Sequence, residues 1–218
     1  MAGCGKGRSD PTLTSPPTMA KSCKIITLHV QIDDIKPPVW RRIVVDGDIT
    51  LRLLHHVLQA AFGWTDSHLH EFTIDGTSYQ MLDNENALEF LDEMSDTPIL
   101  DDRKIRLQRV VQPGQKFVYT YDYGDSWRHI VKVESVETRA EPMYSATILD
   151  GKRAGPPEDV GGPGGYADFL DTIKNHRESE EAQDYLTWVG GNFNPETFDR
   201  RTANNTLARM AWNGWGKQ

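Results

Sequence analysis

The chain has 218 residues, of which 38% are hydrophobic and 26% are charged, and its formal net charge is -8. This length and apolar content predict one folded domain with elaborations and exclude a wholly disordered chain. The acidic excess argues against a protein that grips nucleic acid by its phosphates, because that grip requires a basic patch. A local basic strip at residues 103–109 is the exception.

Both cysteines, Cys4 and Cys23, lie near the N-terminus. Neither stands among other ligand-type residues, so the sequence predicts neither a cysteine zinc site nor a cysteine nucleophile. Without a disulfide framework, the expected location is the reducing cytoplasm. No apolar run reaches the roughly 18 residues of a membrane span, and no apolar stretch precedes Cys4 as a signal peptide would require. We therefore expect no membrane association.

Residues 1–22 are rich in Gly, Pro, Ser and Thr and show no apolar period, which predicts a disordered tail. Met19 resembles an internal start. The folded domain is expected at residues 23–212, followed by a short C-terminal tail at 213–218. Because the N-terminal tail lacks a core-forming pattern, deleting the first 18 residues should leave the melting temperature nearly unchanged.

The first ordered elements are two strands and a helix. Apolar and polar residues alternate at 24–32, which is typical of a half-buried strand, and a second strand is predicted at 39–45. Thr50 is expected to cap a helix at 51–62, whose apolar residues recur at steps of three and four. Gly63 is expected to end that helix.

The middle of the chain alternates strands and turns. The Asp-Gly pair at 75–76 predicts a hairpin between strands at 68–74 and 77–80. The acidic stretch at 83–102 is expected to hold a short helix at 87–94. The predicted strands are 68–74, 77–80, 104–111, 116–123 and 127–136.

The C-terminal part is predicted to be helical after a loop at 154–165 that is dense in proline and glycine. The helices are expected at 166–175, 178–189 and 195–210, with Asn194 as the N-cap of the last. The chain thus begins with strands and one helix, continues with more strands and ends with helices. This order favours an α+β fold over an alternating α/β fold. We therefore expect a single α+β domain with a mostly antiparallel sheet, a helix in its N-terminal half and helices at its C-terminus.

Two histidines, His68 and His70, stand two residues apart in the predicted strand at 68–74. Alternate side chains of a strand share a face, so both imidazoles are expected to point the same way as Phe72. This spacing suits metal binding, because neutral imidazole is the commonest metal ligand near pH 7. The alternative is a pair of structural histidines that hydrogen-bond backbone groups or carboxylates near the end of the sheet.

A second polar group lies where the predicted strand at 116–123 turns into the next one. Asp122 is expected on the face opposite the tyrosines, which include Tyr121, and Asp125 is expected in the turn. Two carboxylates at a strand end beside His129 could bind a metal ion or exchange a proton. The alternative is that the turn carboxylates cap their own backbone.

Residues 155–162 present two further carboxylates, Glu158 and Asp159. Prolines fix the approach and glycines follow, so this pair is expected on a stiff loop. Such pre-organised carboxylates suit a metal ion or a cationic group. They could equally cap the helix predicted near Tyr166 or pair with a buried arginine.

Five segments carry these motifs: 37–42, 62–64, 68–72, 121–127 and 156–162. Their combination resembles the plasmid pRiA4b ORF-3-like family, from about residue 24 to residue 210. The resemblance implies a single α+β domain of roll-like type, found in bacteria and archaea and often near mobile elements, and it implies no particular reaction. Many members have a cysteine in the loop where this chain has Val160, which argues against a thiolate metal site here.

Some relatives carry a resolvase label, which the residues of this chain do not support. A serine resolvase needs a nucleophilic serine among arginines and a basic helix-turn-helix, whereas Ser67 and Ser126 stand beside acids. We consider three functions for this chain, and a nucleic-acid accessory role in mobile elements therefore ranks third.

The first function is a module that binds a small molecule or a partner protein in a cleft between the sheet and the loop at 154–165. Its ligand-binding residues would be Trp64, Tyr121, Asp125 and Trp127, with exposed aromatic side chains. The second is a metal-dependent hydrolase, in which His68 and His70 hold one divalent ion. Its catalytic candidates are Asp122, His129, Glu158 and Asp159. If these residues form one site, their functional atoms should lie within roughly 10 Å of one another.

Overall fold

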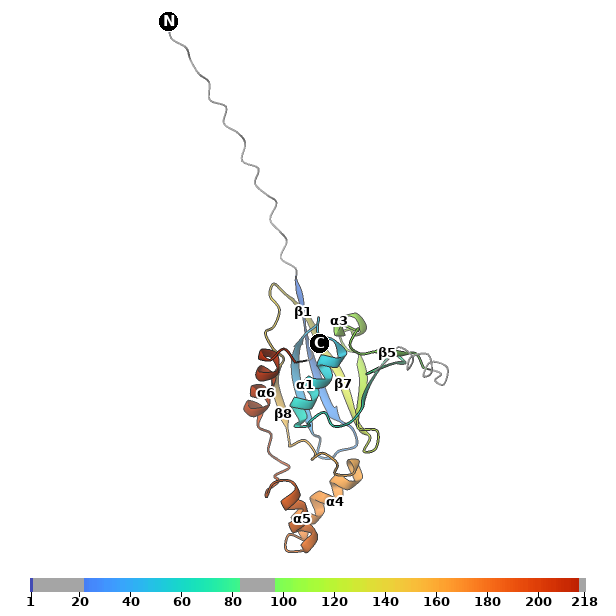
Figure 1. The fold of residues 1–218 in the computed structure, drawn as a ribbon, viewed down its shortest axis with the longest axis vertical. Helices are drawn as coiled ribbons and strands as arrows, with labels where there is room; N and C mark the ends of the chain where they lie inside the picture. Colours follow the sequence, from blue (N-terminus) through green and yellow to red (C-terminus); the bar gives the residue numbers. More distant parts are fainter. Residues whose placement is uncertain (2–21, 83–96, 216–218) are drawn as a thin grey trace.

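Alternating apolar side chains build the centre of one eight-stranded sheet (Figure 1). In β1 (Cys23–Ile32), four alternate residues are fully buried: Ile26, Leu28, Val30 and Ile32. The computed structural model describes residue 1, residues 22–82 and residues 97–215. The other strands are β2 (Trp40–Asp46), β3 (His70–Ile74), β4 (Thr77–Gln80), β5 (Ile99–Asp101), β6 (Lys116–Tyr121), β7 (Trp127–Arg139) and β8 (Thr147–Lys152).

The strand order is β5-β4-β3-β6-β7-β1-β2-β8, and every neighbouring pair is antiparallel except β4 and β5. The register aligns the motifs of three neighbouring strands. His70 of β3 lies opposite Tyr121 of β6, which in turn lies opposite Trp127 of β7. In the next buried row, Tyr119 lies opposite His129. Segments that are far apart in the chain are thus brought side by side.

The described residues form five helices, α1 (Leu51–Phe62), α3 (Leu107–Val110), α4 (Gly162–Asn175), α5 (Glu180–Trp188) and α6 (Arg200–Trp212). Helix α1 lies across one face of the sheet, and α6 packs against both α1 and β8 (Figure 1). Helices α4 and α5 pack against each other at the end of the molecule away from the start of β1 (Figure 1). The sheet therefore carries its helices beside one face and at one end.

The predicted fold class is confirmed, since the structure is one α+β domain with a mostly antiparallel sheet. The helix predicted at 51–62 is confirmed at both ends. Thr50 Oγ1 accepts a hydrogen bond of 3.1 Å from the backbone N–H of Leu53, and Gly63 takes a left-handed φ of 87°. Side-chain capping and a left-handed glycine fix helix ends locally, which is why the sequence alone predicts them.

Two predicted elements differ from the structure more than the others do. The strand predicted at 104–111 is a turn followed by α3, and its one pairing is an isolated bridge between Arg106 and Thr50. The helix predicted at 195–210 begins only at α6, because Asp199 caps that helix through Thr202. Local capping by an aspartate therefore overrides the proline signal.

Strands β5 and β8 have no counterpart among the predicted strands. In β8 only Ile148 is buried, so no alternation marks the strand. The helix predicted at 87–94, and residues 2–21 of the predicted tail, lie outside the described residues. Among the helices that the structure describes, none combines the length and apolar character needed to cross a membrane.

Candidate functional site

Three chain segments meet at the end of the sheet where β3 begins and β6 ends. His68 lies in a bend just before β3, Asp122 directly follows β6, and Asp159 belongs to the loop before α4. His68 Nε2 lies 2.7 Å from Asp159 Oδ1 and 3.6 Å from Asp122 Oδ2. One donor atom from each residue lies within 4.8 Å of the other two. We call these three residues the His68 cluster.

Asp122 is held by the turn between β6 and β7. Its backbone N–H donates to Leu69 O at 2.9 Å, and its Oδ1 accepts hydrogen bonds from Gly124 N and Asp125 N at 2.9 and 3.3 Å. Its φ of 56° is left-handed, which aspartate tolerates because its side chain can bond locally. Asp122 thus caps its own turn through Oδ1, as one sequence-based alternative proposed, and turns Oδ2 towards His68.

Hydrogen bonds hold the loop that carries Asp159 against the same end of the sheet. Trp64 Nε1 donates to Pro156 O at 2.9 Å. Glu158 Oε1 accepts hydrogen bonds from Thr65 N at 2.7 Å and from the Tyr121 hydroxyl at 3.2 Å. These bonds join the loop to β6 and to the segment after α1, so Asp159 is presented by a braced backbone.

A further bond holds the loop to the hairpin. Asp125 Oδ2 accepts a hydrogen bond of 3.0 Å from Gly161 N. Asp125, a candidate ligand-binding residue in the sequence, therefore has a bracing contact in this structure. Together with Glu158, it aligns the loop so that the carboxylate of Asp159 reaches His68.

The His68 cluster is partly open to solvent. The side chains of His68, Asp122 and Asp159 are 32%, 12% and 65% exposed. Partial burial would lower the pKa of His68, but the hydrogen bond to Asp159 and the charges of the nearby carboxylates outweigh it and raise that pKa. The cluster thus favours positive charge at its centre, whether a proton or a bound cation supplies it.

His70 does not join the His68 cluster, because β3 begins only at His70 and the two-residue alternation does not extend back to His68. His70 is buried, and its Nε2 lies 2.8 Å from Asp102 Oδ2. Its ring stacks on that of His55, with centroids 3.5 Å apart and planes within 7°. The structure therefore separates His68 from His70, the two histidines expected to share one metal ion.

His129 is also placed apart from the carboxylates. It is fully buried, and its Nδ1 donates to Trp127 O at 2.9 Å. Its ring meets those of Phe62 and Trp64 edge to face, with centroids 4.9 and 5.3 Å away. Burial lowers its pKa to about 4. The structure thus gives His129 a place in the aromatic core, without the exchange partner expected in Asp122.

The aromatic candidates are more buried than the sequence-based hypothesis requires. Trp64 and Trp127 are 6% and 1% exposed, so the expectation of exposed rings at these positions is wrong. Tyr121 is buried, and its hydroxyl bonds Ser67 N and Glu158. Trp188 on α5 is 48% exposed. The side chains of Trp64, Trp127 and Tyr121 therefore form part of the buried core beneath the site.

Sequence reasoning missed a buried network behind the site. Gln59 Nε2 donates to the Tyr119 hydroxyl at 3.1 Å, and that hydroxyl lies 2.8 Å from His55 Nδ1. His55 Nε2 lies 2.6 Å from Asp66 Oδ1, and Gln59 Oε1 accepts from Asp66 N. The helical period could have found it, because positions 55 and 59 fall on the buried stripe of α1.

His55, His56 and Asp66 form a second group whose donor atoms lie within 4.8 Å of one another. Here the tyrosine hydroxyl can donate to His55 Nδ1, while His55 Nε2 donates to the carboxylate. This network therefore satisfies both nitrogens of the buried His55 ring within the protein. Burial lowers the pKa of His55 to about 3, so the ring is neutral at pH 7. We interpret this group as structural.

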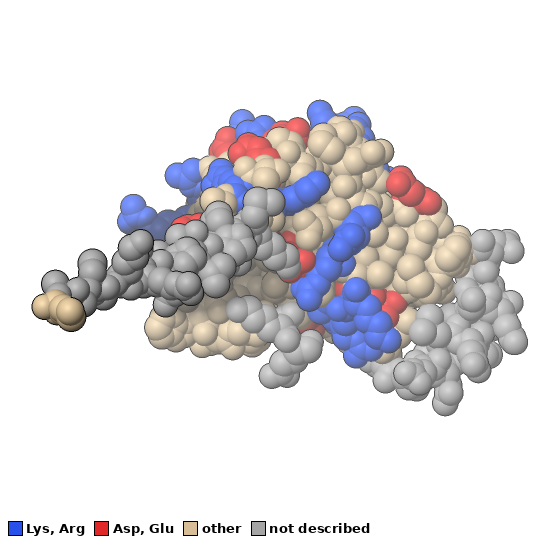
Figure 2. Space-filling view, turned by 90° about the horizontal axis from the view of Figure 1, so that it is seen from above, with Lys and Arg blue, Asp and Glu red and all other residues tan. Residues whose placement is uncertain are grey.

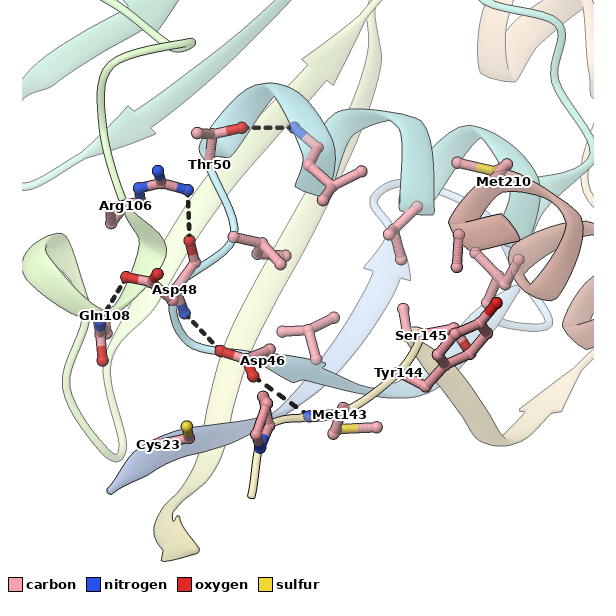
Figure 3. Close-up of a pocket in the computed structure, with 18 of the residues that line it drawn as sticks. Cys23, Asp46, Asp48, Thr50, Arg106, Gln108, Met143, Tyr144, Ser145 and Met210 are labelled. Carbon is pink, nitrogen blue, oxygen red and sulfur yellow. Dashed lines mark hydrogen bonds between the residues drawn. The ribbon is translucent and has the colours of Figure 1, made fainter. Parts of the chain in front are cut away.

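A separate hollow lies beside the first turn of α1 (Figure 3). It has a volume of about 860 Å³. The polar groups on its wall bond one another: Arg106 Nη1 donates to Asp48 O at 2.7 Å, and Gln108 Nε2 donates to Asp48 Oδ1 at 3.0 Å. Met143 N bonds Asp46 in the same way. These polar groups on the wall of the hollow thus have hydrogen-bond partners within the chain.

Lys and Arg side chains form a stripe across this end of the molecule, beside Asp and Glu side chains (Figure 2). Arg103 and Arg106 belong to the basic strip that the sequence shows at 103–109, and both line the hollow. Arg103 pairs with Asp101 at 2.9 Å, while Arg106 bonds a backbone carbonyl. Part of the basic strip is therefore engaged within the chain.

The sequence profile of the plasmid pRiA4b ORF-3-like protein family matches residues 24–202. The chain belongs to this family. Uncharacterized protein y4hQ of Sinorhizobium fredii (strain NBRC 101917 / NGR234) is 38% identical over 168 residues, which is 76% of this chain and 81% of the relative. The resemblance seen in the sequence is thus confirmed.

A solved structure shares the fold of this family member. The crystal structure of the protein of unknown function MM3350 from Methanosarcina mazei Go1 is 33% identical, with a TM-score of 0.70, and the match covers 82% of this chain and 97% of that chain. Neither relative's name states an activity or a ligand.

Proposed function

We propose that this family member is a ligand-binding module whose polar cleft is centred on the His68 cluster, and that a divalent metal ion binds there. One observation carries the proposal: a nitrogen of His68 and carboxylate oxygens of Asp122 and Asp159 converge within 4.8 Å from three separate segments. A cation among these atoms would replace the proton that the raised pKa of His68 favours.

The donor set suits a first-row divalent ion. Zn²⁺ binds imidazole nitrogen and carboxylate oxygen at about 2.0–2.2 Å, and Mn²⁺ and Fe²⁺ accept the same types of donor. Donor atoms that lie within 4.8 Å of one another could therefore share one ion after small side-chain movements. Three protein ligands also leave coordination positions for a water molecule or a ligand group. The braced loop would keep Asp159 in place without a large rearrangement.

An open groove beside Asp159 supports the binding role. It has a volume of about 870 Å³ and runs along α5, where acidic side chains and Trp188 line it. The acidic residues are Glu180, Glu181 and Asp184. An acidic wall with an exposed indole suits a ligand or a partner protein that carries positive charge.

A metal-dependent hydrolase is the second candidate, because a three-ligand site can hold an activated water. Glu158 stands next to Asp159 in the chain, and its carboxylate already accepts hydrogen bonds from Thr65 and Tyr121. It would have to leave these bonds to act as a general base, which is why we rank hydrolysis second. Turnover of p-nitrophenyl phosphate or p-nitrophenyl acetate by metal-loaded protein, lost in His68→Ala, would favour hydrolysis over simple binding.

The binding proposal is tested by calorimetric titration of metal-stripped protein with Zn²⁺, Mn²⁺ and Fe²⁺. We expect about one equivalent to bind, and His68→Ala and Asp159→Asn to weaken binding by at least about tenfold. His176→Ala is the matched control, because His176 is an exposed histidine that pairs with Asp171 outside the site. Affinity should fall as the pH drops through the raised pKa of His68, since the protonated ring no longer donates.

Two outcomes would contradict the proposal. One is a folded wild-type protein that takes up none of the three ions. The other is equal affinity in His68→Ala and His176→Ala. His70→Ala should keep the metal ion, because His70 bonds Asp102 in the core.

A further inference from the structure

A second cavity, of about 560 Å³, lies between the end of α1, the loop at 154–159 and the C-terminal helices. Its walls include the rings of Phe62, Trp188 and Phe198, and Thr206 lies on its α6 side. Small-molecule pockets in proteins commonly measure about 300–1,000 Å³ and are largely apolar with a few placed polar groups. Arg41 supplies the cationic group here.

Arg41 is buried, at 1% exposure, yet much of its guanidinium is tied to backbone. Its Nε donates to Ala61 O at 2.8 Å, and its Nη1 donates to Trp40 O at 2.8 Å and to Lys152 O at 3.0 Å. These bonds use three of its five N–H donors. Among the residues that the structure describes, no hydrogen bond partner accepts from Nη2.

Aromatic rings hold the guanidinium in place. Its central carbon lies 3.7 Å from the ring centre of Phe198 and 4.9 Å from that of Phe62. A Cβ at Gly151 would come within 2.8 Å of Arg41 Cδ and 2.6 Å of the Phe198 ring, so this glycine makes room for the stack. The orientation of Arg41 is therefore built into the fold.

The positive charge of Arg41 has no counter-ion within the described part of the chain, where no carboxylate comes within 4.0 Å of it. The three carboxylates on the cavity wall are bonded elsewhere. Asp199 caps α6 through Thr202, and Glu158 and Asp159 serve the site described above. Burial lowers the pKa of Arg41 to about 9, which leaves it charged at pH 7. A buried charge without a counter-ion is costly.

We propose that this cavity binds a small carboxylic acid, whose carboxylate pairs with Nη2 of Arg41 and whose apolar body packs on the aromatic walls. The carboxylate supplies the missing counter-ion, and guanidinium groups bind carboxylates strongly. The phenyl and indole rings on the wall favour an aromatic or branched aliphatic body. This cavity shares Asp159 with the His68 cluster, but the proposed pairing with Arg41 does not involve Asp159 and needs no metal ion.

The test uses benzoate and 3-phenylpropionate, with benzamide and 3-phenylpropionamide as neutral isosteres, titrated into the full chain by calorimetry. We expect a carboxylate to bind at least tenfold more tightly than its amide. Arg41→Met, which keeps an unbranched stem but removes the charge, should lose this preference, and Arg41→Lys should keep part of it. His68→Ala should bind the acids as the wild type does, which separates this site from the metal proposal.

A second variant guards against Arg41→Met failing to fold. Thr206→Trp places an indole at the cavity wall from an exposed position of α6, and should weaken binding of the acids at least tenfold. Thr187→Trp is its control, because Thr187 is also exposed on a helix and also bonds the carbonyl four residues earlier, but lies outside the cavity lining. Equal affinity for acid and amide would overturn the proposal. So would the absence of binding of either acid to folded wild type, or unchanged binding in Thr206→Trp.

Discussion

Three histidines in the core are kept neutral by burial, and each has a different environment. His55 belongs to the network with Asp66, His70 stacks on it, and His129 lies against Phe62 and Trp64. Burial lowers the pKa of His55 to about 3 and that of His129 to about 4, and it also lowers the pKa of His70. At the residue scale, burial decides the charge of these rings.

These lowered pKa values predict a loss of stability in acid. An unfolded histidine titrates near about 6.5, so between about pH 6.5 and 4 the unfolded chain binds more protons at His129 than the folded chain does. The stabilising contribution is therefore complete above pH 6.5 and is lost as the pH falls towards 4. One such group changes the free energy of unfolding by at most about 1.4 kcal/mol per pH unit.

Urea unfolding at pH 7.5, 5.5 and 4.5 measures this effect. His129→Gln should be less stable than the wild type at pH 7.5, by about 1–3 kcal/mol, because it loses packing and a buried hydrogen bond. The difference should shrink as the pH falls, since glutamine does not titrate. His176→Gln, at an exposed position, should keep the wild-type slope. Parallel slopes for His129→Gln and the wild type would show that burial does not lower the pKa of His129.

At the element scale, the loop before α4 and the first turn of α4 lie so close to their neighbours that some of their positions admit only glycine. A Cβ at Gly155 would lie 2.0 Å from Phe62 O, and one at Gly165 would lie 2.0 Å from Val160 O. By contrast, a Cβ at Gly164 would meet nothing within 4 Å. The close approach at Gly165 sets how the first turn of α4 sits on the loop that carries Asp159.

Two neighbouring substitutions separate close packing from helix propensity. Gly165→Ala should destabilise the protein by about 1–3 kcal/mol, because α4 must move away from Val160 O. Gly164→Ala should be neutral or stabilising by up to about 1 kcal/mol, because alanine favours the helix and meets open space. Chemical denaturation of both variants provides the measurement, and equal effects would show that the close approach is not rigid. Metal affinity should fall only in Gly165→Ala.

Local signals in the sequence predict the elements well where caps and periods agree. The helix at 51–62 has Thr50 before it, an apolar stripe and Gly63 after it, and the structure keeps all three. The segment 104–111 shows the opposite case, because its apolar residues resemble a strand while only Leu107 is buried. Elements with one or two buried residues depend on tertiary contacts that no local pattern records.

The candidate site shows the same limit over longer distances. The sequence nominates His68, Asp122 and Asp159 separately, and the structure places them together. The sequence alone does not show that His68 pairs with Asp159, 91 residues away, rather than sharing a site with His70, two residues away. That choice depends on where β3 begins and on the bonds that Glu158 and Asp125 make to hold the loop.

For the whole molecule, the His68 cluster joins parts of the chain that would separate on unfolding. Its residues come from the bend before β3, the turn after β6 and the loop before α4. An unfolded chain would not hold these three side chains together, so a metal ion should bind the native state far more tightly than the unfolded state. Binding of that kind raises stability in proportion to the logarithm of the free ion concentration.

This linkage predicts a metal-dependent melting temperature. At a free Zn²⁺ or Mn²⁺ concentration 100-fold above Kd, stability should rise by about 2.7 kcal/mol, which corresponds to roughly 5–10 °C for a domain of this size. Asp159→Asn should lower the rise to about half or less, because its carboxylate is lost while its neighbours keep the loop in place. Asp171→Asn, at an exposed carboxylate of α4 that accepts a bond from Asn175, should keep the full rise. Scanning calorimetry at matched ionic strength distinguishes specific binding from screening of the net charge of -8. An equal rise in both variants would mean that the ion acts outside the His68 cluster, because screening and scattered surface carboxylates do not depend on Asp159.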